Sequence, residues 1–326
     1  MCRLMLYLGP ETRLSSLVVE PNHSLIRQSV HSEEREEPLN GDGFGIGWYA
    51  SEHSAEPAVF RSITPAWNNR NLQNLARVVA SDCVLAHVRA ATQSSGVNEA
   101  NCHPFRWRQY LCMHNGDVGD FRLVRRKLLA SVCDEAFGNV YGSTDSEHFF
   151  ALFIDSLLGL DEPDPALRMA QALARAISRV LALVQSHGAG GDSYLNIAIS
   201  DGEHAVVSRF TDAADGVPES LYYYTGQLYA DVGQHARRKG TQAVTVSSER
   251  LTADLGWVEV PANRIIVLRR DRAPQFVDAR TGRSLEDGAE QLADRGGGGH
   301  RQGAPERDAD RGDAERRTAR TRGDRA

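Results

Sequence analysis

The order of local patterns along the chain is the feature that most constrains its fold. Strand-length apolar runs occur near both ends of the sequence, and helical patterns lie between them. The clearest helical pattern covers residues 166–184, where apolar side chains recur every three or four positions. Further along, runs at 194–200 and 204–210 flank Asp201-Gly202, which predicts a β-hairpin. Strands on both sides of a helical middle predict an α+β domain with layered sheets rather than alternating strand–helix units.

The remaining elements are expected from shorter patterns. We expect strands at 1–9 (ended by Gly9-Pro10), 40–49, 58–63, 83–88, 110–114, 221–224, 243–247, 257–260 and 265–268, and helices at 72–79, 118–129 and 146–158. The run at 40–49 carries glycine at four alternate positions. Such spacing is typical of a strand that another backbone approaches closely.

Charge separates the end of the chain from the rest of it. The 326 residues include 37 Lys+Arg and 43 Asp+Glu, for a net charge of −6, but residues 295–326 hold nine Arg and no Leu, Ile, Val, Phe, Met or Trp. A segment without apolar side chains has nothing to bury, so we expect a folded domain at 2–294 and a disordered tail at 295–326. The domain alone carries a charge of −9, which argues against nucleic acid as its main partner.

Several classes of protein do not fit the sequence. No stretch approaches the roughly 20 apolar residues of a membrane span, and the apolar run Leu4–Leu8 is shorter than the core of a secretory signal. The five cysteines show no CxxC spacing, and Cys102, His103, Cys112 and His114 do not have the spacing of four zinc ligands. We therefore expect a cytoplasmic protein that binds neither membranes nor metal.

Cys2 is the first residue with distinctive chemistry. Removal of the initiator Met would leave this cysteine with a free α-amine, whose pKa near 7.7–8.0 suits a general base. Its thiol, with a pKa of about 8.5, is the natural nucleophile beside that base. Taken alone, a cysteine at this position is usually just a small apolar residue in a strand.

Three further short motifs carry polar side chains at the ends of predicted elements. Arg89 ends the buried strand at 83–88, and its guanidinium suits a carboxylate. Asn115 and the backbone N–H of Gly116 could point at one oxygen, as an oxyanion hole requires. Asp145 opens a helix and could pair with an ammonium group. Each also has a structural interpretation: a surface ion pair, a type I′ turn and a helix N-cap, respectively.

Taken in order, these motifs resemble the class II glutamine amidotransferase domain of the N-terminal-nucleophile hydrolases. The resemblance rests on Met1–Arg3, Asn40–Tyr49, His87–Thr92, Asn101–Phe105, His114–Gly116 and Ser143–Glu147. Segments at 62–69, 195–209 and 247–249 resemble the stand-alone branch that contains the amidotransferase-like subunit of the fungal glutathione-degradation complex. The chain departs from that branch at Gln93 and at Arg250, where a small residue and a proline, respectively, are usual.

The resemblance implies a four-layer αββα sandwich and a set of site residues, without a cofactor. It implies Cys2 as the nucleophile with its α-amine as base, Arg89 for the substrate α-carboxylate, Asp145 for the α-ammonium, Asn115 and Gly116 for the oxyanion hole, and Thr92 and His103 as pocket residues without an assigned step. The substrate would be a small γ-glutamyl molecule.

Three functions fit this resemblance. The first is hydrolysis of a γ-glutamyl amide bond, in glutamine or in a compound such as glutathione, through a cysteine thioester and with a partner peptidase or synthase subunit. The second is the γ-glutamyl hydrolase of ergothioneine biosynthesis. The third is a catalytically silent subunit, which we rank last because Cys2, Arg89, Asn115, Gly116 and Asp145 are all present.

Overall fold

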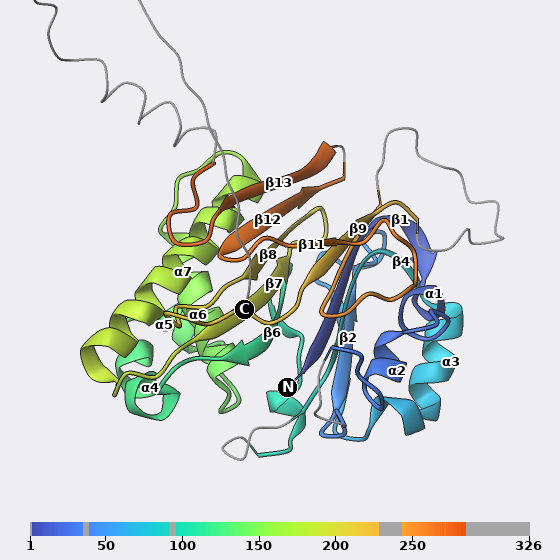
Figure 1. Ribbon diagram of the computed structural model, residues 1–326, viewed down its shortest axis with the longest axis horizontal. Helices are drawn as coiled ribbons and strands as arrows, with labels where there is room; N and C mark the ends of the chain where they lie inside the picture. The colour runs from blue at the N-terminus through green and yellow to red at the C-terminus, as the bar shows by residue number, and fades with distance from the viewer. Residues whose placement is uncertain (1, 35–38, 91–95, 228–242, 271, 285–326) are drawn as a thin grey trace, which may run out of the picture. The chain divides into compact units, whose positions relative to one another are not determined.

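Two antiparallel sheets form the centre of the protein (Figure 1). The computed structural model describes residues 2–34, 39–90, 96–227, 243–270 and 272–284, all within one compact unit that runs to residue 288. The first sheet has the order β11 (Val258–Glu259), β9 (Tyr222–Thr225), β10 (Val244–Ser247), β1 (Arg3–Arg13), β4 (Ala80–Val88), β2 (Phe44–Trp48) and β3 (Ala58–Ser62). The second has the order β13 (Arg272–Asp278), β12 (Arg264–Arg269), β8 (His204–Arg209), β7 (Tyr194–Ser200), β6 (Tyr110–Asp117) and β5 (Phe105–Trp107).

Helices cover the outer face of each sheet (Figure 1). The first sheet carries α1 (Leu14–Val18), α2 (Leu25–Gln28) and α3 (Arg70–Val78). The second carries α4 (Phe121–Leu129), α5 (Asp134–Phe137), α6 (Asp145–Leu158) and α7 (Pro165–His187). This arrangement confirms the predicted α+β class and its four layers, αββα.

The alternation of side chains along the strands builds three apolar layers. In β1, Leu4 and Leu6 pack between the two sheets, whereas Met5 and Tyr7 face the helices α1 to α3. The same alternation places the apolar side chains of β7 partly between the sheets and partly against α6 and α7. Because successive residues of a strand point to opposite faces, each central strand contributes to two cores at once.

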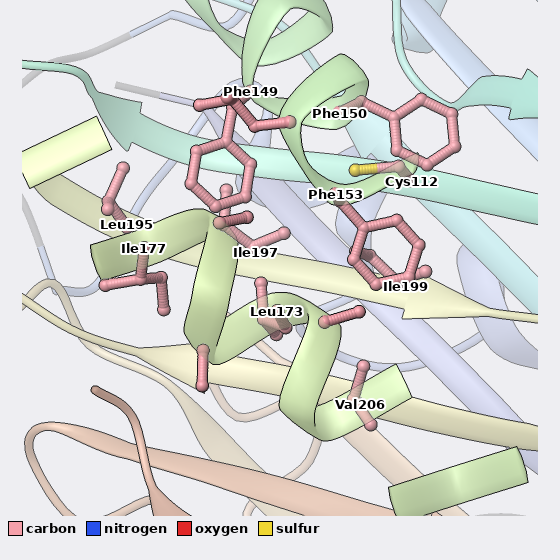
Figure 2. Close-up of a cluster of buried hydrophobic side chains, with 14 of the residues drawn as sticks. Cys112, Phe149, Phe150, Phe153, Leu173, Ile177, Leu195, Ile197, Ile199 and Val206 are labelled. Atoms are coloured by element: carbon pink, nitrogen blue, oxygen red, sulfur yellow. The ribbon is translucent and has the colours of Figure 1, made fainter. Parts of the chain in front are cut away.

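Helices α6 and α7 form the largest core with the second sheet (Figure 2). Thr144 caps α6 by accepting a hydrogen bond from the N–H of Glu147, and Asp164 caps α7 before Pro165 at its first position. In Figure 2, Phe149, Phe150 and Phe153 of α6 lie over strands β6 and β7. No helix in the described part of the chain is long and apolar enough to cross a membrane.

The glycine-rich strand β2 is closely approached by the segment from His103 to Leu111. A Cβ added to Gly45 would overlap with the carbonyl oxygen of His103, and one added to Gly47 would overlap with the side chain of Leu111. The predicted close approach of another backbone to this strand is thus confirmed. It also places the backbone of His103 directly against β2, the neighbour of the edge strand β3.

Some predicted boundaries were wrong. Strand β1 continues through Gly9-Pro10 to Arg13, and its register against β4 shifts between Leu8 and Thr12, the kind of irregularity that admits a proline. Helix α4 begins at Phe121 rather than 118, because Asp120 before it has a left-handed backbone (φ 50°). The short elements α1, α2, α5, β5 and β13 were missed. The tail predicted at 295–326 lies outside the described residues, so the domain boundary stays a prediction.

We expect Phe153→Ala to destabilise the protein by about 3–5 kcal/mol, because it removes a fully buried ring and leaves a cavity. The ring of Phe153 stacks on Phe150 at 6.0 Å and meets Tyr110 edge-on at 6.2 Å. The measurement is urea unfolding. Leu158→Ala in the last position of the same helix, where the side chain is 45% exposed, should cost less than about 1 kcal/mol. Equal costs at the two positions would contradict the packing of α6.

Candidate active site

Strand pairing brings the first predicted site residues together. Strands β1 and β4 are antiparallel neighbours in which Arg3 lies opposite Val88. Cys2, directly before β1, and Arg89, directly after β4, therefore lie at the same end of the first sheet. Gly116 lies near the end of β6 in the second sheet, and Asp145 is the first residue of α6.

A small cavity of about 50 Å³ collects most of these side chains. It is lined by Cys2, Arg89, Ala90, His103, His114, Gly116, Asp117, Thr144, Asp145 and Ser146. Of the predicted site residues, five line it: Cys2, Arg89, His103, Gly116 and Asp145. Asn115 is buried directly before Gly116 and is not among the described lining residues. Thr92 lies outside the described residues.

The thiol of Cys2 is held at the wall of this cavity. Its Sγ lies 3.6 Å from the carbonyl oxygen of Ala90, to which it donates. Burial raises the pKa of the Cys2 thiol, against the smaller lowering effect of the positive charge of Arg89. A thiol with a raised pKa needs a proton acceptor before it can act as a nucleophile.

Arg89 and Asp145 supply opposite charges to the same cavity. Arg89 is only 3% exposed, so its interpretation as a surface ion pair was wrong. The carboxylate of Asp145 accepts from the backbone N–H of Val118 at 2.9 Å and of Ser146 at 2.7 Å, which fixes its orientation. The N-cap of α6 is Thr144, so the N-cap interpretation of Asp145 was also wrong. A guanidinium and a carboxylate around one cavity are complementary to a ligand that carries both a carboxylate and an ammonium.

Gly116 has a backbone that only glycine can adopt at this place. Its φ is +142°, and an added Cβ would overlap with the carbonyl group of Tyr194. Asn115 and Gly116 are part of β6 and pair with Asn196 and Leu195 of β7, so their interpretation as a type I′ turn was wrong. The Oδ1 atom of Asn115 is buried without a hydrogen-bond partner among the described residues.

Three buried histidines lie at the cavity: His103 and His114 line it, and His87 contacts His103. His114 has its Nε2 3.0 Å from the carbonyl oxygen of Tyr194, which can only accept, so Nε2 carries a proton and donates. The ring centroids of His87 and His103 are 4.1 Å apart with the rings tilted by 36°, and both nitrogens of His103 are buried without a partner in the described part of the chain. Burial lowers the pKa of His87 to about 3 and that of His103 well below its ordinary value, so both rings are neutral.

A larger cavity of about 470 Å³ adjoins the first one. The two cavities share Asp117, Thr144 and Asp145 in their walls. Helix α4 lines the larger one with residues that include Leu123. The site can therefore accept a ligand that is larger than the small cavity alone would hold.

The sequence did not single out every residue of this site. His114, Thr144 and Ser146 lie within the quoted motifs and Asp117 directly follows one of them, but only their neighbours were given roles. Arg3 and Glu249 were noticed as parts of motifs, yet nothing in the sequence indicated that they form an ion pair with each other. In the described ranges, no group of three or more His, Cys, Asp or Glu is placed to hold a metal ion.

We expect the free energy of unfolding to fall as the pH drops below about 6.5, with His87 and His103 each contributing about 1.4 kcal/mol per pH unit. Both have a lower pKa in the folded state than the ordinary 6.5, so the unfolded chain binds more protons in this window. Urea unfolding between pH 5.3 and 6.3 measures the slope. His103→Leu should remove the contribution of His103 from this slope. His53→Leu, at an exposed position, should leave the slope unchanged. An unchanged slope in His103→Leu would show that His103 is protonated in the folded protein.

Comparison with known proteins places this geometry in a family. A family model described as class II glutamine amidotransferases matches residues 31–290. The chain is 38% identical over 294 residues to the probable glutamine amidotransferase DUG3 of Saccharomyces cerevisiae, covering 83% of this chain and 82% of that one. It is also 32% identical over 183 residues to the γ-glutamyl-hercynylcysteine sulfoxide hydrolase of Mycobacterium tuberculosis, covering 56% of this chain and 76% of that one.

Solved structures agree with the sequence relatives. A glutamine aminotransferase class-II domain protein from Silicibacter pomeroyi superposes with a TM-score of 0.59 at 28% identity, covering 85% of this chain and 99% of that one. The matched family model covers more than half of the chain, and the yeast relative covers more than two thirds of it. This chain belongs to the class II glutamine amidotransferases.

Proposed function

We propose that the chain hydrolyses a γ-glutamyl amide bond, with Cys2 as the nucleophile. The observation that carries the proposal is the cavity in which the Cys2 thiol meets Arg89, Gly116 and Asp145. A γ-glutamyl group offers one carboxylate, one ammonium and one reactive carbonyl. The cavity walls provide a guanidinium, a carboxylate and a backbone N–H to match them.

The first half of the reaction forms a thioester. After removal of Met1, the α-amine of Cys2 takes the thiol proton, and Sγ attacks the γ-carbonyl carbon. Negative charge develops on the carbonyl oxygen, where Asn115 and the N–H of Gly116 stabilise it. The C–N bond then breaks, the leaving nitrogen takes the proton from the α-ammonium, and the γ-glutamyl group stays on Sγ.

The second half of the reaction returns the enzyme to its starting state. The α-amine accepts a proton from water, whose oxygen attacks the thioester carbonyl and forms a second oxyanion in the same place. Collapse breaks the C–S bond, the sulfur regains a proton and glutamate leaves. Arg89 and Asp145 hold the α-carboxylate and α-ammonium throughout, so the carbonyl keeps its position between the two steps.

The relatives support the proposal that the cleaved bond is a γ-glutamyl amide bond. Glutamine amidotransfer and hydrolysis of a γ-glutamyl-hercynylcysteine sulfoxide both begin with cleavage at a γ-glutamyl carbonyl. The larger identity to the yeast relative favours the branch that the motifs resemble, with glutathione as a candidate substrate and a peptidase or synthase subunit as a candidate partner. The five cysteines, all free, agree with the reducing cytoplasm that we propose for it.

The test is glutamate release from glutamine, glutathione and a γ-glutamyl anilide by protein whose loss of Met1 is verified by mass spectrometry. We expect Cys2→Ala to lower kcat by at least about 10³-fold, because it removes the nucleophile. Cys133→Ala, at an exposed free cysteine, is the matched control and should keep full activity. Release that persists in Cys2→Ala would overturn the proposal. Inactive but folded wild type would favour a silent subunit or a missing partner.

The larger cavity has room for the group beyond the scissile bond. We expect Leu123→Trp to lower kcat/KM for glutathione by roughly 10-fold or more, since the indole would occupy space that a dipeptide leaving group needs. Glutamine loses only ammonia, so its kcat/KM should change less than about twofold. Lys127→Trp, on the same helix and not among the described lining residues, is the control. Equal losses for both substrates would place the leaving group elsewhere.

A further inference from the structure

Arg3, directly after the nucleophile, is almost completely buried. Its side chain is 1% exposed, which is costly for a guanidinium unless its charge is paired and its N–H groups are hydrogen-bonded. Its Nε donates to Oε1 of Glu249 at 2.5 Å, and Nη2 donates to the Ser32 hydroxyl at 2.6 Å. Its Nη1 donates to the carbonyl oxygen of Cys2 at 3.0 Å. A buried cation is thus attached to the backbone of the nucleophile itself.

Glu249 is the centre of this group. It is 1% exposed and accepts from Nε2 of His23 at 2.7 Å, from the Ser32 hydroxyl at 2.6 Å and from the N–H of Glu33 at 2.9 Å, besides Arg3. Burial alone would raise the pKa of the Glu249 carboxyl, but these hydrogen bonds and the charge of Arg3 lower it to about 2. The carboxylate is therefore charged at any pH at which the protein works.

The backbone on both sides of the pair is fixed by the first sheet. Met5 lies opposite Ser247 in the ladder between β1 and β10. Beyond that ladder, the N–H of Ser248 donates to the carbonyl oxygen of Leu4 at 3.0 Å, and the N–H of Leu4 donates to the Ser248 hydroxyl at 3.0 Å. Glu249 consequently follows a segment that is held directly against the start of β1.

A catalytic residue at a chain end has a particular difficulty. Once Met1 is removed, Cys2 is anchored by a single peptide bond, and terminal residues fray unless they are tied down. The hydrogen bond from Arg3 to the Cys2 carbonyl supplies a second anchor on the same peptide group. Its strength depends on Glu249, because the guanidinium would otherwise lose the carboxylate that holds its Nε.

We propose that Arg3 and Glu249 are positioning residues for Cys2, which hold its peptide group in place and set the charge felt by its α-amine and thiol. The proposal rests on the proposed function, in which both groups react. The guanidinium by itself would favour the unprotonated amine and the thiolate, since a nearby cation disfavours the first charge and stabilises the second. Glu249 offsets that cation, while Arg89 and Asp117 are further charged groups that act on the Cys2 thiol.

The decisive variant is Glu249→Gln, which removes the charge and keeps the shape. We expect kcat for the γ-glutamyl anilide to fall about 10–100-fold, because the nucleophile is less well held. KM should change less than about threefold, since Arg89 and Asp145 are untouched. The acid limb of the pH profile of kcat/KM should move to lower pH, because the charge of Arg3 is then no longer offset by that of Glu249. Glu259→Gln, which removes an exposed carboxylate paired with Arg209, should change none of these.

Two further measurements keep the test decisive. Glu249→Asp retains the charge but not the reach, so its kcat should fall while the acid limb stays at the wild-type pH. The rate of Cys2 alkylation by iodoacetamide, followed by mass spectrometry across pH, reports the thiol without any substrate. In Glu249→Gln the pH profile of the alkylation rate should shift to lower pH. This holds even if no γ-glutamyl compound is turned over and the proposed function fails.

A purely structural role gives a different result. It predicts that Glu249→Gln lowers the folded fraction, with an unchanged acid limb and an unchanged alkylation profile in the molecules that remain folded. That outcome, or wild-type kcat in Glu249→Gln, would overturn the proposal. If Glu249→Gln does not fold, Ser32→Ala removes one hydrogen bond from each partner and keeps both charges. It should then lower kcat without moving the acid limb, and an unchanged kcat would count against positioning.

Discussion

The antiparallel pairing of β1 with β4 is the interaction on which the site depends. It places the start of one strand beside the end of the other, so Cys2 and Arg89 become neighbours although 86 residues of chain separate them. The same two strands lie at the centre of the first sheet and contribute side chains to two apolar cores. Cys2, directly before β1, is thereby attached to a central, buried strand of the fold.

The charged side chains near this strand pairing are shielded from water. Arg3 and Glu249 are buried as a pair, whereas His103 in the cavity wall and its neighbour His87 are kept neutral by burial. With these rings neutral, Arg89, Asp117 and Asp145 supply the charges at the cavity wall. Because charges interact more strongly when they are shielded from water, a few well-placed groups are enough for recognition.

Much of the fold could be predicted from periodicity. The helical pattern at 166–184 corresponds to α7 (Pro165–His187), and the Asp201-Gly202 turn joins β7 to β8 as expected. The continuation of β1 through Pro10 could not be predicted, because a proline is tolerated there only through a register shift that involves the neighbouring strand. Strand β5 is three residues long, too short for any periodic signal.

The sequence by itself determined the chemistry available: a cysteine at position 2, an arginine after a buried strand, and an Asn-Gly and an Asp at the ends of predicted elements. The order of the motifs along the chain indicated the family, because these residues follow one another as they do in the family it resembles. Only the tertiary structure decided which of these groups share a cavity, and that Glu249 pairs with Arg3 across 246 positions. No local pattern encodes such a contact, because it exists only when β1 and β10 lie side by side in one sheet.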